Sequence, residues 1–428
     1  MPLLHPDSAL KLVLGEAASA AFGPAQSELL PLSAAFGRVL AEPLVYKVDQ
    51  PPFDKATMDG FAYAKAAGSE GNPAYRVVGG SGAAGLSVRA KLNPGEAARV
   101  MTGAPVPMGS DGVERIEFCE LSQDGQTVCF KQAETARNIV RRGANARAGD
   151  ALLGPCFLEP QDIGILASSG YAEVPAARRP KVGVVSTGDE LVAPGAELGP
   201  ASIYDSNGPA LSAQILRAGA EPVNYGIAGD SPEALAAVLE KALDNCDIVL
   251  LSGGVSMGNF DYVPSTLEAL GVKKIFHKIA FRPGKPCFFG VRRSGSVPRA
   301  ASGKGAEPAG TAPAANLVFG LPGNPMAAFV LFEFLVRPAV AALMGAEYSP
   351  RIFRARLSAP LKQAELERVD VLPLKIVNKD GEFFFEPLPY SGSTMLSVLA
   401  CTDALARLEI GTGTVPEGSV INARLIRS

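Results

Sequence analysis

The sequence predicts a multidomain protein of the α/β plus β class, and three observations support this prediction. Between Val182 and Ser252, buried strands alternate with helices of about 10 to 15 residues, which indicates βαβ units and a parallel sheet. From Val45 to about Asp150, and again after Pro338, short apolar runs are separated by turn residues, which is typical of β-rich modules. A chain of 428 residues also exceeds what one hydrophobic core usually organises, so we expect two to four domains.

Each expected element follows from its own periodicity and its boundary residues. We expect helices over residues 8–22, 160–171, 209–218 and 232–245, and strands of the α/β region over 182–186, 223–227 and 247–252. We expect β strands of the two β-rich regions over 75–78, 97–101, 127–130, 352–357, 369–376 and 420–425. The stretch 293–315 is rich in Ser, Gly, Ala and Pro, and it predicts an exposed loop or a disordered insertion.

The sequence predicts a cytoplasmic protein without a membrane span. The apolar N-terminal stretch contains Asp7 and Lys11 and lacks a basic segment before it, which argues against a signal peptide. The longest apolar run, Met326 to Val336, contains Glu333 and is closed by Pro338. This run is far shorter than the roughly 20 residues that a membrane-spanning helix needs.

Composition excludes several classes of function. A formal net charge of −3 gives no general affinity for nucleic acid. Only two histidines occur, so a histidine-ligated zinc or iron centre would lack ligands, and a Ser-His-Asp catalytic triad would have to use His277. Six cysteines are scattered without a paired spacing, which indicates neither a disulfide framework nor a thiolate metal site.

Three loops that follow predicted strands of the α/β region are candidate binding loops, because open parallel sheets bind ligands at the carboxyl ends of their strands. The first holds Ser186, Thr187 and Gly188, followed by Asp189 and Glu190, which could bind a phosphate and a hard cation. An ordinary loop with solvated acids explains this segment equally well. The other two loops hold Ser252, Gly253 and Gly254, and Pro322, Gly323 and Asn324. Their amides could face an anion, although a Gly-Gly pair after a strand is commonly only a turn.

A basic segment lies between the last two of these loops. Lys278, Arg282 and Lys285 fall within eight residues, two of them around a Pro-Gly turn. Such a group of cations suits an oxyanion or a pyrophosphate better than a solvated face, which remains the alternative. In the β-rich region, Asp59 and Thr102 lie in two further turn sequences, Met58–Gly60 and Thr102–Ala104.

Taken together and in this order, these segments resemble the molybdopterin molybdenumtransferase family, which includes the E domain of gephyrin, from about Arg38 to Leu425. The resemblance implies an elongated homodimer of four-domain chains, with an active cleft between the α/β domain and the β-rich module of the partner subunit. It also implies that the α/β domain is similar to molybdopterin adenylyltransferase. The landmarks that carry it are Met58–Gly60, Thr102–Ala104, Ser186–Glu190, Ile203–Asn207, Ser252–Ser256, Pro283–Pro286 and Gly320–Pro325.

With this resemblance, the expected domains are a discontinuous linking domain (1–45 and 147–179), a β-rich domain (46–146), an α/β molybdopterin-binding domain (180–337) and a C-terminal β domain (338–428). The implied function is insertion of molybdenum from molybdate into adenylylated molybdopterin with release of AMP. Contacts with the molybdopterin adenylyltransferase are expected as well. Tungstate is an alternative substrate, because it has the same charge and nearly the same shape as molybdate.

The resemblance also assigns residues. Asp59, Thr102, Glu190, Asp230 and Asp261 match functional polar residues of the family, and Lys278, Arg282 and Lys285 match its anion-holding cations. Magnesium is the expected cofactor, and Glu190, Asp230 and Asp261 are its expected ligands, because this ion prefers carboxylate oxygens.

Three positions depart from the family pattern. Val140 stands where the family usually has an arginine, and Ala144 and Asn145 stand where it has acids. Neutral drift explains these changes if Asn145 still offers its carbonyl oxygen. The alternative is a catalytically reduced paralogue that binds molybdopterin and serves as a scaffold.

Overall fold

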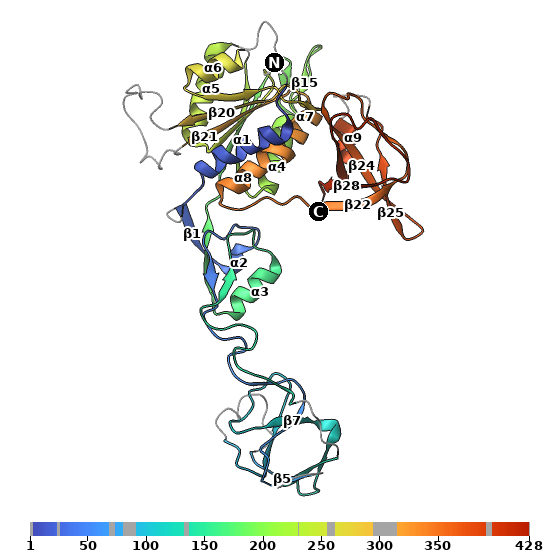
Figure 1. The fold of residues 1–428 in the computed structure, drawn as a ribbon. Helices are drawn as coiled ribbons and strands as arrows, with labels where there is room; N and C mark the ends of the chain where they lie inside the picture. Colours follow the sequence, from blue (N-terminus) through green and yellow to red (C-terminus); the bar gives the residue numbers. More distant parts are fainter. Residues whose placement is uncertain are drawn as a thin grey trace, which may run out of the picture.

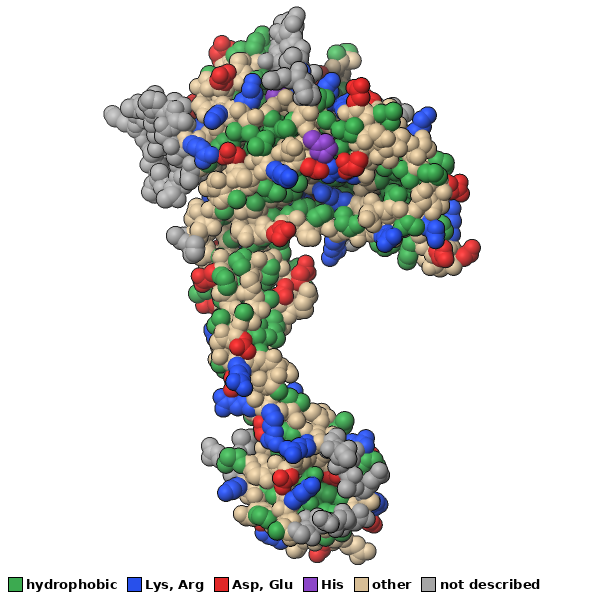
Figure 2. Space-filling model, in the orientation of Figure 1, with side chains coloured by type: hydrophobic (Ala, Val, Ile, Leu, Met, Phe, Trp, Pro, Cys, Tyr) green, Lys and Arg blue, Asp and Glu red, His purple; other side chains and the backbone are tan. Residues whose placement is uncertain are grey.

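The computed structural model is elongated, with a β-rich module at one end, a narrow stalk, and a larger body that holds the α/β sheet and a C-terminal β unit (Figure 1). It describes residues 3–23, 26–67, 73–79, 91–131, 137–229, 231–254, 262–293, 315–390 and 396–427. Figure 2 shows the same outline, with the stalk narrower than either end. The predicted class, an elongated multidomain α/β plus β protein, is confirmed.

The central sheet has six strands in the order β16-β13-β17-β21-β20-β18. Strands β16, β13, β17 and β21 are parallel, as the alternating pattern predicts, whereas β20 and β18 pair antiparallel at one edge. The sheet is therefore mixed rather than wholly parallel, because β20 runs antiparallel to both of its neighbours. The strands are β13 (Lys181–Thr187), β16 (Glu221–Ala228), β17 (Ile248–Ser252), β18 (Lys273–His277), β20 (Phe288–Arg293) and β21 (Ala315–Leu321).

Helices cover both faces of this sheet, because successive strand residues point to opposite sides. Leu250 and Phe319 belong to the core cluster under α1 (Pro6–Ser19), α4 (Asn207–Arg217) and the helical run that follows β21. Their neighbours Leu251 and Val318 belong to the cluster under α5 (Pro232–Asn245) and α6 (Val263–Ala269). The continuous apolar runs of β17 and β21 are thus explained by burial on both faces.

The apolar run after β21 forms a longer helix than the sequence indicates. It comprises α7 (Pro325–Leu331), a π-helical segment (Phe332–Val336) and α8 (Arg337–Leu343). The expected end at Pro338 is wrong, because the π turn widens the helix before this residue and gives the proline ring room. The predicted boundary between residues 337 and 338 falls inside this helix. With 19 residues and a mean hydropathy of 1.9 it is long and apolar enough to cross a membrane, but 83% of it is buried inside the fold, as in a core helix.

The stalk is built from two separate stretches of chain. Strand β1 (Ser27–Pro31) pairs antiparallel with β12 (Glu173–Ala177), and β2 (Leu44–Val45) pairs with β11 (Ala151–Leu153). Helices α2 (Leu32–Ala35) and α3 (Pro160–Ser168) pack on them around a small core that includes Leu40. The chain therefore passes through the stalk twice, once on the way to the β-rich module and once on the way back (Figure 1).

The β-rich module is a six-stranded sheet in the order β7-β4-β6-β5-β9-β8. One side of it carries an aromatic cluster of Tyr63, Tyr75 and Phe130, with ring centroids 4.8 to 5.4 Å apart. A short pair, β3 (Lys55–Ala56) with β10 (Ile139–Val140), lies beside it. The strands are β4 (Gly60–Tyr63), β5 (Ala74–Val77), β6 (Glu96–Val100), β7 (Gly112–Arg115), β8 (Cys119–Leu121) and β9 (Thr127–Phe130).

The C-terminal unit is a β sheet that closes on itself, because β24 pairs with both β25 and β26. A two-residue strand from the α/β part, β19 (Phe281–Arg282), pairs parallel with β24 and joins the two units. The remaining strands are β22 (Ile352–Leu357), β23 (Leu361–Lys362), β24 (Val369–Lys379), β25 (Glu382–Pro387), β26 (Ala404–Leu408), β27 (Thr414–Val415) and β28 (Val420–Leu425), with helix α9 (Leu396–Cys401).

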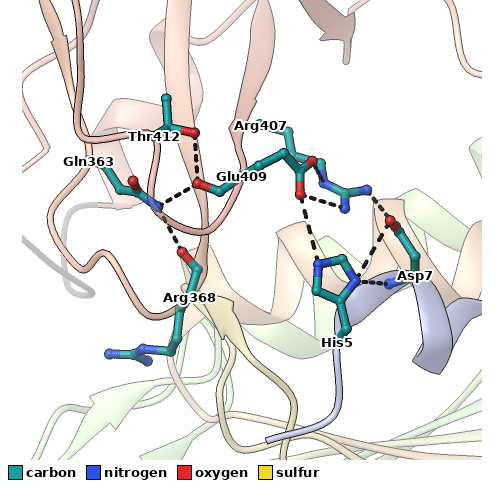
Figure 3. Close-up of polar contacts among 7 residues, drawn as sticks. All are labelled: His5, Asp7, Gln363, Arg368, Arg407, Glu409 and Thr412. Carbon is teal, nitrogen blue, oxygen red and sulfur yellow. Dashed lines mark hydrogen bonds and ion pairs between the residues drawn. The ribbon is translucent and has the colours of Figure 1, made fainter.

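Polar contacts also fasten the first helix to this C-terminal unit (Figure 3). The guanidinium of Arg407 in β26 donates to Asp7 at 2.7 Å, and Nε2 of His5 lies 3.8 Å from the carboxylate of Glu409. The start and the end of the chain are thereby held together. Of the predicted exposed loop 293–315, residues 294–314 lie outside the described residues.

Candidate functional site

A pocket of about 350 Å³ opens at the carboxyl ends of β13, β17 and β21. All three predicted binding loops contribute to its wall, as expected for an open α/β sheet. The predicted residues that line it are Thr187, Gly188, Glu190, Ser252, Gly253, Gly254 and Gly323, and they are joined by Leu191, Ile203, Tyr204, Asp205, Ser206, Asn207 and Pro325.

Two buried polar residues hold these loops in place. The carboxylate of Asp205 accepts hydrogen bonds from Oγ of Ser186 at 2.7 Å and from the amide of Gly208 at 2.9 Å. The side-chain amide of Asn207 donates to Oγ of Ser252 at 2.7 Å and to the carbonyl of Gly323 at 2.8 Å. Asn207 therefore joins the second and third loops, and Asp205 joins the first loop to the start of α4. Ser186 and Ser252 are both buried and shape the pocket from beneath.

A glycine is required at the bend of the second loop. Gly253 has a φ of 97°, a conformation that side chains rarely adopt. A Cβ there would lie 2.5 Å from the carbonyl oxygen of Thr187, and Gly323 also lies close by, since its own Cβ would be 3.6 Å from the Gly253 Cα. The main chains of the three loops therefore lie close together. Because Gly253 and Gly323 have no side chains, a ligand can contact main-chain atoms there.

Two helices begin at this pocket. Asn207 is the first residue of α4, and Pro325 is the first residue of the run that continues to Leu343. The exposed amides of a helix N-terminus carry partial positive charge, which favours an anion there. The side chain of Asn324 caps the second helix, since its Oδ1 accepts from the amide of Ala327 at 3.1 Å. Asn324 therefore stabilises the start of this helix, Pro322 is buried, and neither residue lines the pocket.

Glu190 is the exposed acid of the pocket rim. Its carboxylate folds back over Gly188, because a Cβ at that glycine would lie 2.7 Å from both of its oxygens. Its two expected partners in metal binding, Asp230 and Asp261, lie outside the described residues. Among the residues that are described, no three His, Cys, Asp or Glu side chains come together as a metal site. Asp205 is used within the fold, since each of its two oxygens already accepts a hydrogen bond.

The three predicted cations occupy one loop but have different surroundings. The backbones of Lys278 and Lys285 lie at the two ends of the loop, which is closed by hydrogen bonds from Lys278 to Cys287 and from Ile279 to Lys285. Arg282 instead pairs with Asp370 of the C-terminal unit, Nη1 to Oδ2 at 2.8 Å, and this aspartate is fully buried. Arg282 therefore joins two units of the body, and Lys285 is the exposed cation of the loop.

Asp59 and Thr102 come together in the β-rich module. Oδ1 of Asp59 accepts from the amide of Thr102 at 2.6 Å and from its hydroxyl at 2.7 Å. These two donors, the amide first, hold the pKa of the Asp59 carboxyl below its usual value. In Figure 1 this module lies at the opposite end of the molecule from the α/β sheet. Within one chain, Asp59 and Thr102 are therefore separate from the predicted residues that line the pocket, and Lys278, Arg282 and Lys285 do not line it either.

The unusual positions lie in the same module as Asp59. Val140 is half-buried in the short strand that pairs with Lys55, and Asn145 is exposed in the following turn. The neighbouring arginines remain in ion pairs, Arg141 with Asp54 and Arg142 with Asp49 at 2.6 Å.

Sequence reasoning about the site omitted Asp205 and Asn207. Both belong to the stretch Ile203–Asn207, which counts among the landmarks of the family resemblance but has no strand-plus-glycine signature. A polar run directly before a predicted helix is a helix-start signal, and this signal could have placed them at the pocket.

Comparison with known proteins agrees with this architecture. Residues 183–342 match the family model described as "Probable molybdopterin binding domain", residues 4–170 match "MoeA N-terminal region (domain I and II)", and residues 354–426 match "MoeA C-terminal region (domain IV)". Fold, pocket and these matches together define a multidomain protein of molybdenum-cofactor biosynthesis.

Comparison with individual proteins identifies the family within this class. The chain is 35% identical to a molybdopterin molybdenumtransferase of Nostoc sp., over 92% of this chain and 87% of the relative, and 31% identical to that of Bacillus subtilis, over 94% and 90%. A crystal structure of the molybdopterin biosynthesis moeA protein from Pyrococcus horikoshii matches with a TM-score of 0.75 and 30% identity over the full length of both chains. The chain belongs to the molybdopterin molybdenumtransferase family of enzymes.

Proposed function

We propose that the protein inserts molybdenum from molybdate into adenylylated molybdopterin and releases AMP. The observation that carries this proposal is the pocket at the carboxyl ends of β13, β17 and β21, which combines glycine-containing loops with two helix N-termini. Such a wall of main-chain amides suits the phosphate groups of an adenylylated pterin. The pocket also lies within the segment that matches the probable molybdopterin binding domain.

The cations and carboxylates of the α/β part are proposed to have different roles. Lys278 and Lys285 are proposed to attract molybdate, a dianion, while Arg282 holds the loop that carries them through its pair with Asp370. Hydrolysis of the adenylate is coupled to capture of molybdenum by the two dithiolene sulfurs, which the substrate itself supplies. Magnesium is proposed to bind at Glu190 with Asp230 and Asp261, where it would neutralise phosphate charge.

Asp59 and Thr102 enter this proposal through a second copy of the chain. They lie at the far end of the molecule from the pocket (Figure 1), so we propose a homodimer in which each β-rich module reaches the partner's pocket. The proposed setting is the cytoplasm, where the adenylyltransferase would deliver the substrate by contact.

The test is to incubate the purified protein with adenylylated molybdopterin and either molybdate or tungstate, and to measure AMP release together with the metal bound to the pterin. AMP that appears in step with metal insertion supports the transferase function, and the more effective oxyanion identifies the metal. A ligand that stays bound and intact with both oxyanions contradicts it and favours the scaffold function, which the Val140 and Asn145 positions suggest. Activity restored by Asn145→Asp would assign that loss to the missing carboxylate.

A further inference from the structure

We propose a second ligand site, a cavity of about 770 Å³ that binds a nucleotide-sized organic anion with a planar apolar body. It lies at the inner corner where the stalk meets the body, and we call it the corner cavity. Its wall comes from three parts of the fold: the stalk with Phe36 and Phe157, the helices α4 and α8, and the end of the chain with Arg427. The C-terminus marks this corner in Figure 1, and Figure 2 shows basic side chains along the lower edge of the body.

The corner cavity is distinct from the pocket of the proposed function. Helix α4 begins at that pocket with Asn207 and ends at the corner cavity with Leu216 and Arg217. Ten residues of α-helix separate the two sites by about 15 Å. The helical run that begins at Pro325 also connects the two sites, because Pro325 lines the pocket and Arg337 lines the corner cavity. This inference does not depend on the proposed transferase activity.

The charged side chains of the cavity wall favour an anionic ligand. Five arginines line the cavity against two glutamates: Arg179, Arg217, Arg337, Arg351 and Arg427, with Glu159 and Glu347. Arg217 and Arg337 also pair with Glu333, which is fully buried beneath the wall, so five cations face three carboxylates in all. Guanidinium groups bind phosphate and carboxylate groups through paired N–H donors.

Two of these arginines are available to a ligand. The side chains of Arg179 and Arg351 are exposed and have no hydrogen bond or ion pair to the residues that the structure describes. Both lie outside helices, Arg179 between β12 and β13 and Arg351 between α8 and β22, so neither is explained by the dipole at a helix end. Both line the same cavity, so a bound anion could pair with two guanidinium groups there.

The apolar and aromatic side chains of the cavity wall favour a ligand with a planar apolar group. The aromatic side chain of Phe36 is 62% exposed and Leu216 is 59% exposed, although both are large and apolar. Phe157 and Tyr348 add two further rings, and the guanidinium of Arg337 stacks 4.9 Å from the centre of the Tyr348 ring. The volume lies in the range of about 300 to 1,000 Å³ typical of sites for small organic ligands. A nucleotide has both the ring and the phosphate that this wall requires.

The absence of tryptophan from the chain allows a direct test. Phe36→Trp would place the only tryptophan at the cavity, and its fluorescence is followed while ADP is added. We expect a saturable change with ADP and a weaker one with inorganic phosphate, which lacks the ring. Adding Arg179→Ala and Arg351→Ala should weaken ADP binding at least tenfold. Arg354→Ala is the matched control, since Arg354 is an exposed arginine three residues further on that does not line the cavity.

Titration calorimetry of ADP into the chain with its natural Phe36 gives a second measurement, in case the tryptophan disturbs the wall. No saturable binding by either method would overturn the proposal, as would equal affinity with and without the two arginines. A change in sedimentation coefficient on removing the arginines, without ADP binding, would also overturn it, because the cavity would then be a surface between copies of this chain.

Discussion

At the residue scale, the Asp59–Thr102 pair is the part of the proposed site whose geometry is most specific. Asp59→Asn keeps Oδ1 as an acceptor for both donors of Thr102, so the fold should persist while the negative charge is lost. We expect AMP release to fall by at least about 100-fold, the range that positioned acid–base groups contribute. The assay is AMP release with molybdate, alongside circular dichroism as a check of the fold.

The same module provides a matched control for this substitution. Asp124 also accepts one hydroxyl, from Ser122 at 2.6 Å, and one backbone amide, from Gln126 at 3.1 Å, but in the turn between β8 and β9. Asp124→Asn should leave AMP release unchanged. If both variants lose activity equally, the effect of Asp59→Asn is structural, and Asp59 has no place in the site.

At the element scale, the buried carboxylate of Glu333 joins helices of the body at the π segment. It accepts from Gln214 at 2.9 Å and from Arg337 at 3.0 Å, and it pairs with Arg217, whose Nη1 also donates to the carbonyl of Ile426 at 2.6 Å. Arg424 of β28 donates to the Glu333 carbonyl at 2.6 Å. The π turn thus places an acid where α4, α8 and the C-terminal strand meet, which is a specific use of a widened helix.

Glu333→Gln should therefore lower the free energy of unfolding. Charge-assisted hydrogen bonds to two arginines are lost, and since both arginines are partly exposed we expect a loss of about 2 kcal/mol. Urea denaturation followed by circular dichroism measures it. Glu382→Gln, on the exposed end of β25, is the control and should change the midpoint little. Equal midpoints for all three proteins would show that the network contributes nothing to stability.

At the scale of the whole molecule, the contacts of Figure 3 hold the first helix against the C-terminal unit. The hydrogen bond from Arg407 is the main cause that lowers the pKa of the Asp7 carboxyl below its usual value. A carboxyl group with a lowered folded-state pKa stabilises the fold above its unfolded-state pKa, and this contribution is lost as the pH falls through the folded-state value.

Asp7→Asn should accordingly lower stability at pH 7, by less than about 1 kcal/mol because the Asp7 side chain is half-exposed. The difference from the natural chain should shrink below about pH 4, where Asp7 begins to protonate in the unfolded chain. Guanidinium denaturation at pH 7 and at pH 3 measures both values. A difference that is the same at the two pH values would contradict a charge-based contact.

The sequence by itself determined most of the elements and the three loops of the pocket. The predicted strands and helices between residues 182 and 252 appear within a few residues of their expected bounds, because the period of apolar residues directly reflects which faces are buried. The glycines after β17 likewise marked a close backbone approach, which Gly253 makes to Thr187. The family also followed from the order of the motifs, and the relatives confirm it.

Only the tertiary structure decided which residues share an environment. Arg282 pairs with Asp370, which is 88 positions away in the sequence. The helix continues through Pro338 because of a π turn that no local sequence pattern indicates. Asp205 and Asn207 hold the pocket loops through hydrogen bonds to residues distant in sequence. The arginines of the corner cavity likewise come from separate parts of the chain. Local periodicity records burial, whereas contacts between distant segments depend on how whole units pack, and the sequence of one segment does not contain that information.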